Sequence, residues 1–170
     1  MKNNIKSKVI LLLILLMFVS FYMSLKANSV PTSPISNAQH KQIINNYLRQ
    51  IESMQNQVDA IAQSAISGPV EDREQLRARI SVINTNIENL NSVIQDYLSA
   101  NLGISERNRH IILTFNFINL VKSNLYTLSE LIGTTNSIDQ FLLLNEYFST
   151  RVNALDTLEI LRQILGKYNL

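Results

Sequence analysis

Apolar residues recur at helical spacing along most of the chain. Between Ile44 and Ala65, and again between Leu76 and Tyr97, they alternate at intervals of three and four residues. This repeat of about 3.5 residues is typical of helices that pack in a bundle or a coiled coil. Two more apolar stretches follow. The pattern predicts four helices, at about residues 37–67, 70–101, 105–132 and 137–166.

Glycines and capping residues support these boundaries. The four glycines fall close to the predicted helix ends: Gly68, Gly103, Gly133 and Gly166. Glycine favours such positions because it adopts positive φ at little cost. Ser36 with Gln39, and Ser137 with Gln140, have the spacing of capping boxes. Short loops join antiparallel helices, so residues 37–170 are predicted to form an all-α, up-down-up-down four-helix bundle with coiled-coil-like seams.

Two alternatives to this fold exist. Residues 113–117 alternate apolar and polar side chains with a period of two, as in a strand. A lone strand would have no partner elsewhere in the chain, so helix is the preferred prediction. The second alternative is a pair of long helical hairpins that dimerise instead of closing into a monomeric bundle.

The N-terminal 27 residues have the pattern of a secretory leader. Lys2, Lys6 and Lys8 precede an apolar segment, residues 9–25. Its length lies between the about 7–15 residues of a signal peptide and the about 20 of a membrane span. Residues 1–27 are predicted to be either a signal peptide cleaved after Ala27 or a signal-anchor helix in the membrane, followed by an extended linker, 28–36. Both alternatives place the bundle outside the cytoplasm.

Charge and cysteine content bear on two classes of function, nucleic-acid binding and thiol chemistry. Four of the 15 basic residues lie in the leader, whereas all 13 acidic residues follow it, so the remainder carries a net charge of −2. The basic surplus of the whole chain therefore gives no support for nucleic-acid binding. The absence of cysteine excludes disulfides and thiolate chemistry. The frequent asparagines suggest an AT-rich bacterial source.

No motif for catalysis, a cofactor or a metal is recognisable. Glu106 and His110 would share a helical face, but di-iron bundles need Glu-x-x-His on two helices. Asp59 follows Val58 of the apolar stripe, so its side chain is expected to point away. A surface ion pair is the expected role of Glu106 and His110. The chain is predicted not to be an enzyme and to bind no metal or cofactor.

A candidate anion patch lies near the start of the second predicted helix. Arg73 and Arg77 are four residues apart and share a face. The alternative is an ordinary solvated face in which Glu74 pairs with Arg77. A polar residue inside a helix seam would favour a ligand site. The first two helices are expected to have none, and only Lys122 and Ser129 lie near the stripe of the third.

The third and fourth helices have more apolar residues than one stripe requires. On the fourth, the predicted inward stripe is Phe141, Phe148, Val152 and Leu155. Since no helix is central in a regular four-helix bundle, the remaining apolar flank needs a cover. This flank is the predicted partner surface: Leu113, Phe117, Leu120, Leu131, Leu143, Tyr147, Leu161 and Leu165. In an irregular bundle, the same residues would instead be ordinary core.

These observations lead to one functional hypothesis and one alternative. The chain is expected to be a non-enzymatic helical bundle, exported or membrane-anchored through residues 9–25. It would act through contacts with a protein partner or by self-association at the bacterial cell envelope. The alternative is an extracytoplasmic bundle that binds a small molecule or ion between its helices.

Overall fold

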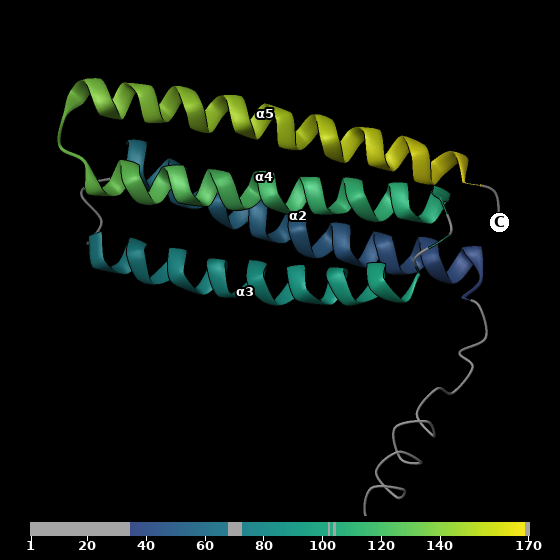
Figure 1. The fold of residues 1–170 in the computed structure, drawn as a ribbon. Helices are drawn as coiled ribbons and strands as arrows, with labels where there is room; N and C mark the ends of the chain where they lie inside the picture. Colours follow the sequence, from purple (N-terminus) through teal and green to yellow (C-terminus); the bar gives the residue numbers. More distant parts are fainter. Residues whose placement is uncertain (1–34, 68–72, 102, 104, 169–170) are drawn as a thin grey trace, which may run out of the picture. The chain divides into compact units, whose positions relative to one another are not determined.

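The computed structural model describes residues 35–67, 73–101, 103 and 105–168. The predicted leader, its cleavage site and residues 28–34 of the linker lie outside this part of the chain. The described residues form helices α2 (Asn37–Ser67), α3 (Arg73–Ala100), α4 (Ser105–Gly133) and α5 (Ser137–Lys167) (Figure 1). They contain no strand, so the all-helical prediction is confirmed and the strand alternative at 113–117 is wrong.

Helix α4 occupies the centre of the bundle. Consecutive helices run in opposite directions, and α4 lies between α3 and α5 (Figure 1). It packs against all three other helices, while α2 also packs against α3. The expectation that no helix is central is therefore wrong. A central helix must be apolar on several sides, and this explains why the apolar residues of α4 exceed one stripe.

The helix ends follow from local capping chemistry. At the start of α2, Ser36 N donates to Gln39 Oε1 at 2.9 Å and Gln39 N donates to Ser36 Oγ at 3.2 Å, which confirms the first capping box. The second predicted box is wrong. Asn136 caps α5 instead, because its Oδ1 accepts from Ile138 N at 2.9 Å, one residue before the expected cap. Gly103, between α3 and α4, has a positive φ of 107°, a conformation that glycine adopts at little cost.

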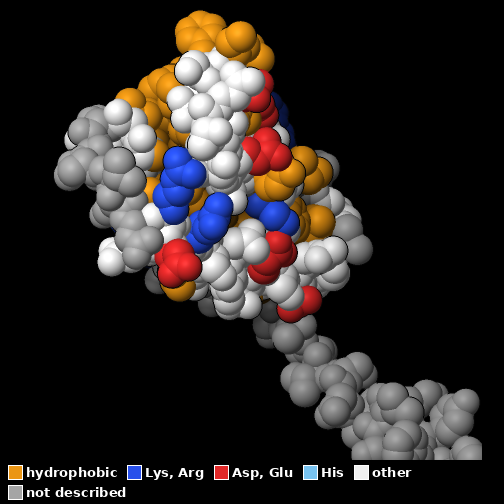
Figure 2. Space-filling model, turned by 90° about the vertical axis from the view of Figure 1, so that its left-hand side faces the viewer, with side chains coloured by type: hydrophobic (Ala, Val, Ile, Leu, Met, Phe, Trp, Pro, Cys, Tyr) orange, Lys and Arg blue, Asp and Glu red, His pale blue; other side chains and the backbone are white. Residues whose placement is uncertain are grey.

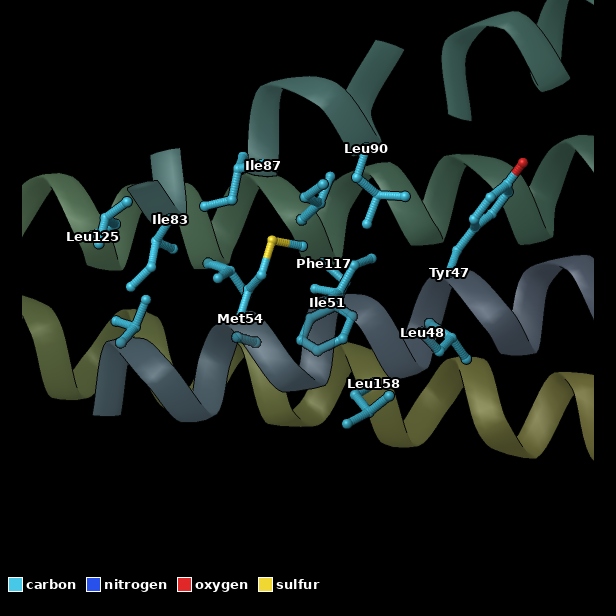
Figure 3. Close-up of a cluster of buried hydrophobic side chains, with 14 of the residues drawn as sticks. Tyr47, Leu48, Ile51, Met54, Ile83, Ile87, Leu90, Phe117, Leu125 and Leu158 are labelled. Atoms are coloured by element: carbon cyan, nitrogen blue, oxygen red, sulfur yellow. The ribbon is translucent and has the colours of Figure 1, made fainter. Parts of the chain in front are cut away.

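The core confirms the predicted stripes of α2 and α3, except that Ala65 at the end of the α2 stripe is exposed. Side chains of α2 and α3 face one another across the bundle, with α4 beside them (Figure 3). Ile51 and Ile87 are among the fully buried members of this cluster, and Phe117 of α4 is also fully buried. Leu158 extends into it from α5 (Figure 3). All four helices therefore share one apolar core.

The orientation of α5 is opposite to the prediction. Phe141 and Phe148, expected to point inward, are 70% and 52% exposed, whereas Tyr147 and Leu161 are 2% and 0% exposed. The reason is that α5 has apolar residues on two sides, so periodicity alone does not decide which side is buried. The buried side also carries Ala154, whose small side chain favours close helix packing.

Candidate functional site

The predicted partner surface belongs to the core. Five of its eight residues are buried: Phe117, Leu131, Tyr147, Leu161 and Leu165. The other three are half-buried: Leu113, Leu120 and Leu143. This part of the prediction is wrong because α4 packs against all three other helices and the packed side of α5 is the one assigned to the flank.

A different apolar surface remains exposed on α5. We call it the outer face, and its apolar members are Ile138, Phe141, Leu142, Phe148, Val152 and Leu155. Each of them is 40–70% exposed. Hydrophobic side chains gather at the top of the bundle end where α5 begins (Figure 2). Single exposed apolar residues are common, but a continuous patch over several helical turns marks an interaction surface.

The outer face is regular, and its stripe between Ile138 and Leu155 contains no charged residue. Phe141, Phe148, Val152 and Leu155 follow the three-and-four spacing of a coiled-coil seam. The polar residues within the same stripe, Asn145 and Ser149, are both neutral. The surface therefore fits an apolar partner better than a charged one.

An ion-pair network holds α5 in this orientation. Arg151 Nε of α5 donates to both carboxylate oxygens of Asp59 in α2, at 3.0 Å each. The Tyr147 hydroxyl donates to Asp59 Oδ1 at 2.6 Å, and Gln55 Nε2 donates to the same atom at 2.8 Å. Asp59 thus points toward α5, a contact that its position next to Val58 did not predict. Its side chain avoids the apolar seam because it lies on the adjacent face of α2.

The electrostatics of the network favour a charged carboxylate. Burial alone would raise the pKa of Asp59, but hydrogen bonds from Arg151, Tyr147 and Gln55 outweigh this effect and hold the pKa below its ordinary value. Burial, and then the hydrogen bond to Asp59, raise the pKa of Tyr147, so its hydroxyl remains a donor. One carboxylate therefore binds two groups of α5 and fixes the rotation of that helix.

We expect Asp59→Ala to reduce the free energy of unfolding by about 1–3 kcal/mol, because the buried Tyr147 hydroxyl loses its acceptor. Urea titration of the purified chain measures the loss. Glu52→Ala is the matched control, since Glu52 of α2 also pairs with an α5 arginine, Arg162, at a more exposed position. A loss of less than about 1 kcal/mol is expected there. Equal losses in the two variants would contradict the assigned role of Asp59.

Polar side chains are also buried between α2 and α4, where none was expected on α2. Gln55 is 3% exposed, and Asn124 of α4 is fully buried. Asn124 Nδ2 donates to Gln55 Oε1 at 3.4 Å. Gln55 also binds Asp59, so this pair continues the network inward from α5. The sequence pattern gave no sign of this burial, because Gln55 lies next to the stripe residue Met54 and leaves the apolar spacing unchanged.

The two histidines lie together at the end of the bundle where α2 begins and α5 ends. His40 Nε2 and His110 Nδ1 are 3.0 Å apart, and His40 Nδ1 lies 2.7 Å from the Tyr97 hydroxyl. Tyr168 packs edge-on against His110, with ring centroids 4.8 Å apart, and donates to Asn37 Oδ1 at 2.8 Å. This cluster joins all four helices. His110 is therefore buried, and the expectation that it forms a surface ion pair is wrong.

The histidine pair is held in the neutral form. Burial, together with repulsion by the positive charges of His110 and Arg107, lowers the pKa of His40 to about 4. Burial also lowers the pKa of His110; Glu106 opposes this shift and Arg109 adds to it. Burial raises the pKa of Tyr97, whose phenol can therefore donate to His40 Nδ1. His40 can then donate its Nε2 proton to His110 Nδ1.

The remaining candidates do not converge on a binding site. Arg73 and Arg77 are exposed, but they line two different hollows, Arg73 beside Leu76 and Gln140 and Arg77 beside Lys122. Within the described ranges, no group of three or more His, Cys, Asp or Glu side chains is arranged to hold a metal ion. None of the helices α2 to α5, as far as the structure describes them, has the length and apolar composition to cross a membrane.

Comparison of the chain with protein-family models, with curated proteins and with solved structures found no significant match.

Proposed function

We propose that this chain is a non-enzymatic helical-bundle protein that acts through protein–protein contacts at the bacterial cell envelope. In this proposal the outer face of α5 is the contact surface. It replaces the flank of α4 and α5 that the sequence pattern suggested. The bundle itself, with antiparallel coiled-coil-like seams, serves as a rigid support for that surface.

The observation that supports the proposal is the exposure of an ordered apolar stripe on a firmly held helix. Phe141 and Phe148 are large aromatic side chains of the kind that dominate the energetics of protein contacts. The Asp59 network fixes α5 at Tyr147 and Arg151, one residue before and three after Phe148. The stripe is therefore presented by a rigid scaffold, and little ordering is needed when a partner binds.

The proposed location follows from the predicted leader, residues 1–27, whose apolar segment is 9–25. An apolar segment preceded by lysines directs the following chain out of the cytoplasm. The bundle is then either released after cleavage at Ala27 or kept at the outer side of the membrane by residues 9–25. In both cases the outer face of α5 meets partners outside the cytoplasm.

A second candidate function is binding of a small polar molecule between α2 and α4. Its support is the buried pair Gln55 and Asn124, of which Asn124 Oδ1 accepts no hydrogen bond from the described residues. A melting-temperature screen against ions and common metabolites distinguishes the two candidates. A ligand bound between the helices would raise the melting temperature, and Asn124→Leu would abolish the rise.

The contact proposal is tested by placing charges on the outer face. We expect the double variant Phe141→Glu/Phe148→Glu to keep the melting temperature within a few degrees while losing at least tenfold in partner capture, since both side chains are exposed. The measurement is recovery of bound protein, including further copies of the chain, when the tagged full-length chain is isolated from the host envelope.

The matched control is Val82→Glu/Val93→Glu on α3, where both valines are more than half exposed. This control adds the same charge at a different surface and is expected to capture partners as the unmodified chain does. Equal capture by both double variants would refute the outer face of α5 as the contact surface.

A further inference from the structure

We infer that the occupant of the outer face is the outer face of a second copy of this chain, paired antiparallel, α5 against α5. This inference rests on the proposed function, because it names the partner of the same surface. Three properties of the stripe support it: its self-complementary order of side chains, its distribution of charge, and its area.

The order of side chains favours an antiparallel pair. The aromatic residues, Phe141 and Phe148, lie toward the N-terminal side of the stripe, and the smaller Val152 lies toward its C-terminal side. In an antiparallel pair centred between Glu146 and Tyr147, Phe141 of one copy lies opposite Val152 of the other, and Phe148 lies opposite Asn145. Large side chains then face small ones, the arrangement by which layers fill space. A parallel pair would place each phenylalanine opposite itself.

The length of the stripe fits the same register. Ile138 and Leu155 bound it, and each would lie opposite the other residue in the second copy. The intervening residues span roughly 26 Å at about 1.5 Å per residue. The antiparallel direction also opposes the two helix dipoles. The two outer layers, Ile138 with Leu155 and Phe141 with Val152, are thus apolar on both sides, whereas Phe148 packs against Asn145 near the two-fold axis.

The charges disfavour a lipid surface as the occupant. Helices that lie on membranes carry Lys and Arg beside their apolar face, whereas four exposed residues near this face are acidic, Asp139, Glu146, Asp156 and Glu159, and the exposed Arg162 is paired with Glu52 of α2. These acidic groups would be repelled by anionic lipids. A second copy avoids this repulsion in the middle of the pair, where Asn145 and Ser149 are neutral.

The exposed area is sufficient for a specific contact. If an aromatic side chain buries roughly 150–250 Å² and an aliphatic one somewhat less, the partly exposed side chains of the outer face offer about 600 Å² per copy. Two copies would then bury roughly 1,200 Å², at the lower limit of the about 1,200–2,000 Å² of stable interfaces. A symmetric pair is also the commonest closed assembly of identical chains.

Disulfide trapping tests both the pairing and its direction. The chain has no cysteine, so a single introduced thiol reports one contact without background. In the full-length chain, Asn145→Cys lies next to the proposed two-fold axis, and we expect most of the oxidised protein to migrate as a dimer on a non-reducing gel. Glu159→Cys lies on the same stripe but roughly 40 Å from its counterpart at about 1.5 Å per residue. It is expected to remain monomeric.

Two controls complete the experiment. Adding Phe141→Glu/Phe148→Glu to Asn145→Cys is expected to remove the dimer band, because the apolar contact is lost. Equal dimer formation at positions 145 and 159 would overturn the antiparallel register in favour of a parallel pair. Absence of the dimer band at both positions, with the unmodified chain monomeric in a mass measurement, would overturn pairing with a second copy.

Further outcomes separate this inference from the proposed function. If the chain is monomeric and the outer-face variant loses capture of a different protein, pairing with a second copy is wrong and the contact surface stands. If the chain instead floats with vesicles of anionic lipid in a way that Phe141→Glu/Phe148→Glu abolishes, lipid is the occupant and the inference is overturned. If the chain is monomeric and the thiol at position 145 is unreactive, another segment of the same chain covers the outer face. This result would also overturn pairing with a second copy.

Discussion

Phe117→Ala is expected to lower the free energy of unfolding by about 3–5 kcal/mol, the usual cost of removing a fully buried aromatic side chain. Phe117 is fully buried in α4, the helix that packs against the other three. Its removal leaves a cavity in the middle of the shared core, where no single helix can move to fill it. Urea unfolding followed by circular dichroism measures the change, and the slope of the transition should remain the same.

Phe148→Ala is the matched control for this prediction, because it removes the same type of side chain from the exposed outer face of α5. Phe148 is 52% exposed, so the cost in the monomer should be below about 1 kcal/mol. The contrast also tests the assignment of faces. If Phe148→Ala were the more costly change in monomeric protein, the outer face would be core and the orientation of α5 would be wrong.

The second large effect is a loss of stability in mild acid that depends on the histidine pair. The pKa of His40 is lowered to about 4 from its ordinary value of 6.5, and that of His110 is lowered as well. Between about pH 4 and pH 6.5, the unfolded chain therefore binds more protons than the folded chain. Stability is therefore complete above about pH 6.5 and falls as the pH decreases toward 4. For His40 alone the loss approaches about 3 kcal/mol at the acid end.

Denaturant titrations at intervals from pH 7.5 to 4.5 measure this dependence. The double variant His40→Gln/His110→Gln is expected to flatten the profile, whatever its stability at neutral pH. The lowered pKa of Asp59 does not interfere, since the stability it contributes is lost only below the ordinary carboxylate pKa of 3.8. A profile equally steep in the double variant would exclude the histidine pair as the cause.

The sequence was sufficient to predict α2 and α3. Each has a single apolar stripe, so the inward face is unambiguous, and residues such as Ile51 and Ile87 are buried as expected. The first capping box and Gly103 marked helix ends because capping depends on residues adjacent in sequence. Local chemistry and one-sided periodicity therefore determined the number of helices and most of their boundaries.

The rotation of α5 could not be predicted from its own sequence. Phe148 and Tyr147 are adjacent and similar in size, and each belongs to an apolar stripe with helical spacing. What decides between them is the carboxylate of Asp59, which lies 88 residues from Tyr147 in sequence and binds its hydroxyl. The choice was therefore made by a long-range polar contact, to which hydrophobic periodicity is insensitive.

The polar clusters were hidden for the same reason. His40 and His110 are 70 residues apart, and each alone resembles an ordinary surface residue of an amphipathic helix. Only the packing of α2 against α4 brings the two rings together. The central position of α4 was equally inaccessible, because the order of helices in space does not follow from four similar stripes.

The most direct test of the central claim is the reactivity of a single thiol on the outer face in intact host cells. Asn145→Cys and Ser92→Cys, on α5 and α3, are both at exposed positions. If a protein covers the outer face, the thiol at position 145 should react with a membrane-impermeant maleimide at least tenfold more slowly than the thiol at position 92. The two rates should converge when Phe141→Glu/Phe148→Glu is added. Equal rates at positions 145 and 92 without those substitutions would contradict the proposal that the outer face of α5 is a contact surface.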